Sequence, residues 1–300
     1  YGLVVQDRIS DISKLGICVI TTVVLVYGRG YSEKRNLLRG EFLALVLFGA
    51  VGMMVMVSAN HLITLYIGLE LLSLCLYALI ALHRDSAEAT EAAMKYFVLG
   101  ALASGILLYA MSLLYGLTGT LELAGIRQSV SGFSPDDLPL AVALILVIVG
   151  LLFKLGAVPF HMWVPDVYAG SPTSVTAYLA SAPKIAAFVI VFRLLGTSLE
   201  PLIEVWQDML IAVALLSIGF GNLVASAQRN MKRMLAYSTI SHMGFFLLGI
   251  LSGDAVGYSA AMLYALIYAV ISLGVFGCIL HFSGEDFDAD QLDDYRGLSR

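Results

Sequence analysis

Nearly the whole chain consists of apolar stretches long enough to cross a membrane. A hydrocarbon core about 30 Å thick is spanned by a helix of about 20 apolar residues. Hydrophobic residues make up 59% of the sequence and charged residues 13%, which is not the composition of a soluble domain. We therefore predict an all-α polytopic membrane protein. Its nine predicted transmembrane segments lie at 12–28, 41–58, 61–82, 91–116, 138–159, 172–196, 203–226, 233–252 and 257–282.

The length and uniformity of these stretches exclude a transmembrane β-barrel, because barrel strands alternate polar and apolar residues over about ten positions. No linker rich in glycine, serine or proline divides the chain, so residues 1–300 are expected to form a single integral membrane domain. The longest polar stretch, 117–137, is expected to be an extramembrane loop. The sequence begins at Tyr1 and ends in a polar stretch at Arg300, and we expect it to be a piece of a longer protein.

The positive charges gather at one face of the predicted bundle. The face that holds the N-terminus, called side one, carries four of them, and the opposite face, side two, carries ten. The positive-inside rule then places side two, with loops 29–40 and 227–233, in the cytoplasm. The cations are Arg8, Lys14, Arg127 and Arg193 on side one, and Arg29, Lys34, Arg35, Arg39, Arg84, Arg229, Lys232, Arg233, Arg296 and Arg300 on side two.

The fifth segment contains a signal for a broken helix. Its apolar run meets Pro159 and Pro165 within HMWVPDVYAGSP, and proline removes a backbone donor and interrupts the helical ladder. Backbone of this kind at membrane depth is tolerated only where it faces protein or water, and it marks ion sites in transporters. We predict a discontinuous helix near Lys154–Pro159. Pro183 similarly precedes Lys184 in the sixth segment.

Ionisable residues stand inside the apolar segments. A charge at the bilayer centre costs about 2.5–3.5 kcal/mol on the insertion scale, so its default interpretation is functional. With a rise of about 1.5 Å per residue, Glu70, Lys154 and Lys184 all fall near the midplane. Lys95 lies nearer the side-two end of its segment, where a long side chain can also reach the interface. These groups predict a path for protons or cations.

Three motifs resemble a known family at the same residues. They are LFKLGAVPFHMWVPDVYAGSPTSV (152–175), NMKRMLAYSTISHMGF (230–245) and LYIGLELLSL (65–74). They resemble the antiporter-like membrane subunits of proton-pumping NADH–quinone oxidoreductase (respiratory complex I) and the related Mrp-type cation/proton antiporters. The residues that follow the shared PxHxWxPD core are most similar to the N-type branch of that family.

This resemblance implies a fold of fourteen helices that holds two inverted five-helix repeats, each with one broken helix. The nine predicted segments match helices three to eleven. Residues 41–196 would form the first repeat, and residues 203–282 an incomplete second repeat that stops before its own broken helix. The fold class expected is therefore an inverted-repeat, antiporter-like bundle.

The resemblance also implies a proton relay. Lys154 matches the lysine of the broken helix and would store a proton reversibly, Glu70 would be the partner that sets its charge state, and Lys184 would pass protons onward. The physics agrees, because burial disfavours a charged lysine and a nearby carboxylate restores it. Moving one proton against ~200 mV costs about 4.6 kcal/mol, which the separation of such a pair could supply. The alternative is a static buried ion pair.

Other candidates are weaker. Lys95 is a relay candidate that could instead reach the interface. His242 is a possible relay, although histidine in membrane helices commonly bonds to a neighbouring helix. His161 and Asp166, beside the predicted break, are candidates for proton uptake or simple interfacial anchors. Arg229, Lys232 and Arg233 are expected only to set the topology.

No cofactor is expected in this chain. Cys18, Cys75 and Cys278 are isolated, lack CxxC spacing, and are expected to be small buried residues rather than cluster or haem ligands. No glycine-rich phosphate loop or nicotinamide fingerprint occurs. Flavin mononucleotide (FMN), iron–sulfur clusters and quinone are therefore expected in partner subunits, and metal and nucleic-acid sites are not expected.

The function expected is proton translocation as a subunit of NADH–quinone oxidoreductase, a translocase, coupled to quinone reduction elsewhere. The resemblance implies partners that include antiporter-like subunit M and small subunit K, and a place in the bacterial inner (plasma) membrane. Two alternatives remain open. One is an Mrp-type antiporter subunit that exchanges Na⁺ for H⁺, and the other is a bundle needed only for assembly.

Overall fold

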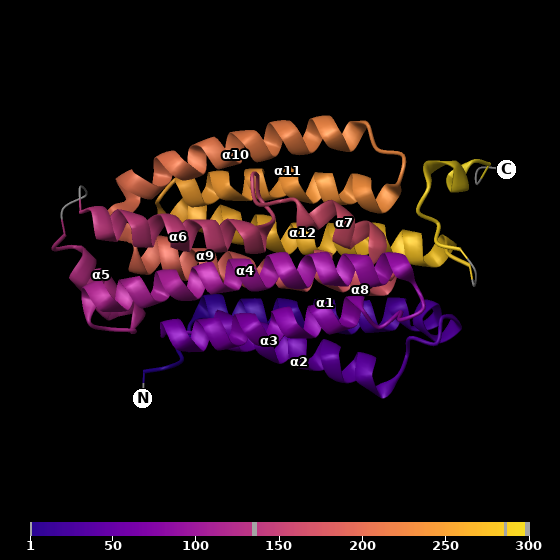
Figure 1. The fold of residues 1–300 in the computed structure, drawn as a ribbon, viewed down its shortest axis with the longest axis horizontal. Helices are drawn as coiled ribbons and strands as arrows, with labels where there is room; N and C mark the ends of the chain where they lie inside the picture. The colour runs from indigo at the N-terminus through magenta and orange to yellow at the C-terminus, as the bar shows by residue number, and fades with distance from the viewer. Residues whose placement is uncertain (1, 134–136, 285–286, 298–300) are drawn as a thin grey trace.

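The structure, a computed structural model, describes residues 2–133, 137–284 and 287–297, which form a bundle of long helices along one axis (Figure 1). In this part of the chain nine helical spans are long and apolar enough to cross a membrane, and no β-strand occurs. The α-helices are α1 (Arg8–Lys34), α2 (Gly40–Val57), α3 (Leu62–Ile80), α4 (Ala87–Thr118), α5 (Leu123–Val130), α6 (Leu138–Leu155), α7 (Trp163–Gly170), α8 (Thr173–Ala180), α9 (Ala182–Val191), α10 (Ile203–Ser226), α11 (Met231–Leu251) and α12 (Ala255–Phe282).

The helices begin and end where local chemistry favours it. Asp7 and Ser10 form a reciprocal capping box, so α1 begins four residues before the predicted segment. This arrangement satisfies backbone donors that a helix leaves free at its start. The polar stretch 117–137 is not simply a loop, because it contains α5. A π-helix (Phe192–Ser198) and two 3₁₀ turns (Glu200–Leu202 and Leu292–Tyr295) complete the elements.

The sixth predicted segment is the axis of the bundle. It comprises α8, α9 and the π-helix, and 94% of the residues in its most apolar 18-residue stretch are buried inside the protein. Helix α9 packs against α1, α2, α6 and α12. The outer helices instead expose large apolar side chains such as Leu102, Leu223 and Val270, as expected of surfaces that face lipid.

In each of two helix pairs, the helices approach each other closely at glycine residues. A Cβ atom on Gly52 of α2 would lie 2.8 Å from the Gly68 carbonyl oxygen of α3. A Cβ atom on Gly221 of α10 would lie 2.6 Å from the Ser241 nitrogen of α11. Small residues let membrane helices approach this closely. Each pair opens one of the two predicted repeats, and the repeat boundaries stay a prediction.

Arg193, counted above with the side-one cations, is buried inside the protein. It is 6% exposed, and its guanidinium donates to the Asp7 carboxylate at 3.1 Å and to the Val57 carbonyl at 2.8 Å. Burial alone would raise the pKa of Asp7, but the Ser10 backbone N–H and the Arg193 charge hold that pKa below its ordinary value. The pair ties the start of α1 to the centre of the bundle.

Two further predictions from the sequence concern the cysteines and Arg300. Cys75 is buried, but Cys18 and Cys278 are exposed on their helices, so the prediction of burial was wrong for these two. Arg300, counted with the side-two cations, lies outside the described residues. The N-terminal end of α1 and the last described element, the 3₁₀ turn Leu292–Tyr295, lie at opposite ends of the bundle (Figure 1).

Candidate functional site

The predicted break in the fifth membrane segment is confirmed. Helix α6 ends at Leu155, four residues before the predicted end, because Gly156 adopts a left-handed conformation (φ 78°) that closes the helix. Glycine takes this conformation without steric cost. The chain resumes as a helix at Trp163, whose indole N–H donates to the Phe153 carbonyl at 3.0 Å. The Val158 N–H donates to the Ser217 hydroxyl, also at 3.0 Å.

Lys154 lies in the last turn of α6, directly before this break. Its ammonium group donates to the hydroxyl oxygens of Ser73 on α3, at 3.1 Å, and Ser104 on α4, at 3.0 Å. Both acceptors are neutral. An ammonium group has three donors, so two of them are directed to hydroxyls on neighbouring helices.

Lys184 lies on α9 and is 4% exposed. Its ammonium group donates to the carbonyl of Leu155 at 3.2 Å and lies 5.7 Å from the centre of the Trp163 ring. Leu155 is the last residue of α6, so its carbonyl belongs to the negative end of a helix dipole. Lys184 therefore caps the broken helix.

A second interruption lies beside Lys184. Helices α8 and α9 meet at Ser181, which has a non-helical backbone (φ −112°, ψ −85°). The Ser181 hydroxyl donates to the Ala177 carbonyl at 2.5 Å. Pro183, in the first turn of α9, has no N–H to continue the ladder. Both central lysines thus stand next to a break in their helix.

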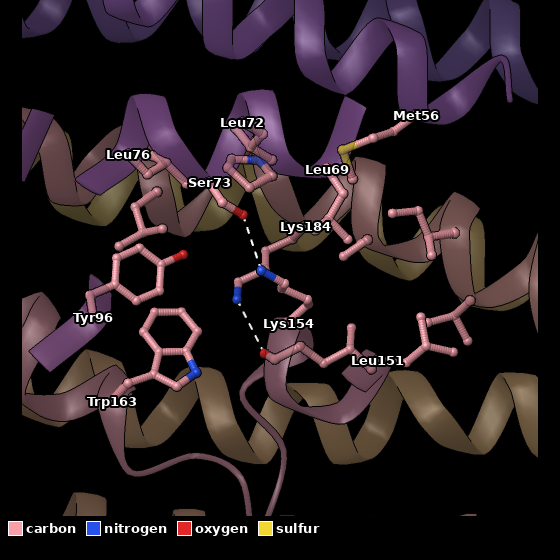
Figure 2. Close-up of a pocket in the computed structure, with 16 residues that line it drawn as sticks. Met56, Leu69, Leu72, Ser73, Leu76, Tyr96, Leu151, Lys154, Trp163 and Lys184 are labelled. Carbon is pink, nitrogen blue, oxygen red and sulfur yellow. Dashed lines mark hydrogen bonds between the residues drawn. The ribbon is translucent and has the colours of Figure 1, made fainter. Parts of the chain in front are cut away.

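The two lysines line the same cavity, whose volume is about 40 Å³. A water molecule needs about 10–15 Å³ measured in this way, so the space admits water. Figure 2 shows both side chains in this space, with Ser73 on one side and Tyr96 and Trp163 on another. The remaining walls are mostly aliphatic, among them Leu69, Leu72, Leu76, Leu151 and Leu179.

Glu70 lies on α3, one turn from Ser73, and does not line this cavity. Among the described residues no ion pair within 4.0 Å joins it to Lys154. One buried carboxylate oxygen of Glu70 has no hydrogen-bond partner in the described part of the chain. Glu70 is thus a close neighbour of the lysine cavity and not a tight partner within it.

Lys95 lies outside the cavity of the two central lysines. It forms ion pairs with Glu91 and Asp166, each at 2.8 Å, and its side chain is 43% exposed. Arg233 pairs with the other Asp166 oxygen at 2.5 Å. Burial alone would raise the pKa of Asp166, but hydrogen bonds and charge from Lys95 and Arg233 hold that pKa below its ordinary value. Lys95 therefore lies in a half-exposed charge network at side two.

His242 lies on α11, away from the central cavity. Its Nδ1 atom is 2.6 Å from the Tyr264 hydroxyl, and its ring lies 5.1 Å from the Tyr268 ring. His161 lies in the segment after the break and packs edge-on against Phe220. Burial lowers the pKa of His161. The structure therefore brings neither histidine into the cavity of the two lysines.

Sequence reasoning missed Ser73 and Ser104, the direct partners of Lys154. Serine is common in membrane helices, and only the spacing of Ser73 three residues after Glu70 could have drawn attention to it. It also missed the burial of Lys232, which is 2% exposed. Across the described residues, no group of three His, Cys, Asp or Glu side chains is placed to hold a metal ion.

The chain matches the family described as NADH:quinone oxidoreductase/Mrp antiporter, TM, over residues 59–300. NADH-quinone oxidoreductase subunit N of Thiobacillus denitrificans is 57% identical over 299 residues, which are 100% of this chain and 62% of that protein. The expected likeness to the N-type branch is thereby confirmed. This chain spans about three fifths of the length of that relative.

Solved structures of similar chains support the same family assignment. A chain of respiratory complex I from Thermus thermophilus with bound aureothin is 36% identical, with a TM-score of 0.76, over 93% of this chain and 58% of that chain. A chain of the Mrp complex from Dietzia sp. DQ12-45-1b is 25% identical, with a TM-score of 0.78, over 92% of this chain and 51% of that chain. The predicted antiporter-like bundle is confirmed. The chain belongs to the NADH:quinone oxidoreductase/Mrp antiporter transmembrane family.

Proposed function

We propose that this chain is a proton-translocating membrane subunit of NADH–quinone oxidoreductase. Protons would move through Glu70, Lys154 and Lys184, and the movement would be coupled to quinone reduction in other subunits. The chain would thus take part in a translocase reaction without holding a redox centre. FMN, iron–sulfur clusters and quinone would be bound by its partners.

The observation that carries this proposal is the shared cavity of Lys154 and Lys184 at the break of α6. In the described part of the chain both ammonium groups donate only to neutral oxygens. Like charges that share one cavity repel each other, and the repulsion is stronger in surroundings of low dielectric constant than in water. Charge on one lysine therefore disfavours charge on the other, and a proton gained by one favours release from its neighbour.

Glu70 would control this exchange from outside the cavity. Moving one proton against ~200 mV costs about 4.6 kcal/mol. A change in the separation of Glu70 and Lys154 alters their attraction, and in a site of low dielectric constant that change is large. The proposal therefore requires that the distance between Glu70 and Lys154 changes during turnover.

The test uses the complete native complex in sealed vesicles. Lys154→Ala and Lys154→Met are expected to reduce NADH-driven proton uptake and quinone reduction together, measured with a pH-sensitive dye and by NADH oxidation. Lys34→Met, which removes an exposed cation at the end of α1, is the matched control. Normal pumping in an assembled Lys154 variant would remove this lysine from the mechanism.

The alternative function is that of an Mrp-type cation/proton antiporter subunit. The likeness to a chain of the Mrp complex from Dietzia supports it. Purification under mild conditions separates the two functions. An NADH–quinone oxidoreductase subunit is expected to co-purify with flavin and iron–sulfur proteins, whereas a subunit of an antiporter would not carry them and would exchange Na⁺ for H⁺ without NADH.

The partners and membrane are part of the same proposal. We expect the chain to lie in the bacterial inner membrane with side two in the cytoplasm, beside antiporter-like subunit M and small subunit K. Cross-linking of the native complex, followed by mass spectrometry, tests the neighbours. A membrane-impermeant thiol reagent applied to a cysteine placed at Arg229 tests the orientation. Labelling only from the periplasm would show that side two does not face the cytoplasm.

A further inference from the structure

Lys184 forms no ion pair with an acidic residue in the part of the chain that the structure describes. It is 4% exposed, and its ammonium group donates to the Leu155 carbonyl at 3.2 Å. An ammonium group has three donors, and burial removes most of the water that would bind the other two. A buried charge must be compensated. A relay that loads Lys184 with a proton therefore needs a further source of stabilisation for the ammonium form.

Trp163 offers that stabilisation through its aromatic ring. The Lys184 ammonium nitrogen lies over this ring, 5.7 Å from its centre. A cation within about 6 Å of an indole centre is attracted by the negative charge of the ring face, and the attraction is stronger where water is excluded. Trp163 is 2% exposed. Both side chains line the central cavity, where Figure 2 shows them together.

The indole is held in place by contacts from both sides of the helix break. Trp163 is the first residue of α7, and its N–H donates at 3.0 Å to the carbonyl of Phe153, in the last turn of α6. The Phe153 ring packs against it at 5.8 Å. On α4, Tyr96 stacks on the indole, with 4.6 Å between the ring centres and 24° between the planes. The ring is thus fixed before any charge reaches Lys184, and a site that is ordered in advance needs no rearrangement to stabilise that charge.

We propose that Trp163 is a positioning residue of the relay, whose ring stabilises the ammonium form of Lys184. This inference rests on the function proposed above. The ring attracts the ammonium group, whereas the neutral amine lacks the charge that this attraction requires. The contact therefore favours the uptake of a proton by Lys184. Trp163 itself neither accepts nor releases a proton, so the proton balance of the relay is unchanged.

The competing explanation is that Trp163 only supports the break, through its hydrogen bond to Phe153. Fluorine on the benzene ring of tryptophan separates the two explanations. It withdraws electron density from the ring face and so weakens the attraction for a cation. The same substitution makes the indole N–H a stronger donor. Fluorination therefore preserves a structural support and removes the stabilisation of a charged lysine.

The experiment measures NADH-driven proton uptake by the complete native complex in sealed vesicles. Mono-, di-, tri- and tetrafluorotryptophan are introduced in turn at position 163 by nonsense suppression. The initial uptake rate is expected to fall with each added fluorine. The tetrafluoro analogue is expected to lower it about tenfold, which corresponds to about 1.4 kcal/mol. A rate that stays constant along the series, or rises, would overturn the proposal.

A tryptophan analogue that carries a methyl group in place of the single fluorine controls for bulk. The methyl group is larger than fluorine but does not withdraw electrons from the ring. Complex that holds this analogue at position 163 is therefore expected to pump at nearly the wild-type rate. A loss as large as that caused by fluorination would show that the effect is steric and that the proposal is wrong.

Trp206 is the matched control position. It is fully buried, and its indole N–H likewise donates to a backbone carbonyl, that of Leu199, at 2.9 Å. Among the described residues no lysine or arginine lies over its ring. The same fluorinated series at Trp206 is expected to leave the uptake rate unchanged. An equal fall at both positions would contradict a role specific to Lys184.

Lys154→Met and Lys184→Met in the same membranes keep this inference separate from the proposed function. If both assembled variants are deficient and the fluorinated complexes pump normally, the relay stands and the role of Trp163 is wrong. If Lys184→Met pumps at the wild-type rate, the relay through Lys184 is itself wrong, and the inference fails with it.

Discussion

Removal of the two serines that bind Lys154 is a sharp test of the central site. Ser73→Ala and Ser104→Ala together delete both hydroxyl partners of the ammonium group, at 3.1 and 3.0 Å. The lysine itself stays in place, as do the helix break and the cavity walls. The double variant therefore changes the free energy of the charged form of Lys154 and little else.

The magnitude follows from the contacts. A hydrogen bond to a charged group contributes about 1.5–3 kcal/mol, so the two bonds together contribute about 3–6 kcal/mol. The cavity of about 40 Å³ admits water, which needs about 10–15 Å³, and water can replace one of the two bonds. The net loss is then about 1.5–3 kcal/mol, a factor of roughly 10–150 in the population of the charged form.

The assay compares proton uptake and NADH oxidation in vesicles that hold the complete complex. Both rates are expected to fall at least tenfold in the double variant and by less in each single variant. Ser13→Ala is the control, since that hydroxyl is buried and has no hydrogen-bond partner in the described part of the chain. A double variant that assembles and pumps at the wild-type rate would refute the reasoning.

Three further predictions follow from other parts of the structure. Glu70→Gln keeps the side-chain shape but removes the acid that lies one turn from Ser73, the partner of Lys154, so proton uptake is expected to fall severalfold while the unfolding temperature in detergent stays unchanged. A fall in the unfolding temperature together with the uptake rate would indicate a structural carboxylate. Gly52→Ala places a Cβ atom 2.8 Å from backbone atoms of α3 and is expected to destabilise the bundle by about 1–3 kcal/mol, whereas Gly105→Ala, with open space around it, is not. The pKa of Asp166 lies below its ordinary value, so its ion pairs stabilise the fold above about pH 4 and are lost as the pH falls through the folded-state pKa. The difference in unfolding temperature between wild type and Asp166→Asn is therefore expected to shrink below about pH 4. A difference that stays constant with pH would contradict this prediction.

The sequence predicts the spans well because hydropathy over about 20 residues reflects a strong and local requirement of the bilayer. The break near Lys154 is also a local feature, since Gly156, Pro159 and Pro165 are visible in the sequence. The exact end of α6 is not, because proline disrupts the turn before it while glycine decides where the helix closes. The helix therefore ends at Leu155 and not at the predicted position 159.

The partners of the lysines depend on how distant helices pack. Nothing near Lys184 indicates that it reaches the carbonyl of Leu155, because that contact requires the relative placement of α6 and α9. Lys232 shows the same limit. Its neighbours Arg229 and Arg233 are also basic residues, and the sequence does not show which of the three is buried. Lys232 is the buried one, beside Asp288 in the segment that folds back onto α11.

The carbonyl of Leu155 gives Lys184 a counter-charge that cannot be neutralised by pH. The end of a helix carries roughly half a negative charge, made of peptide dipoles and not of an acid. A carboxylate in the same place could take the proton itself and hold it there. A dipole accepts a hydrogen bond from the ammonium form, yet it offers no competing base when the lysine becomes neutral. The interrupted helix can thus hold Lys184 in place without adding a second group that binds a proton.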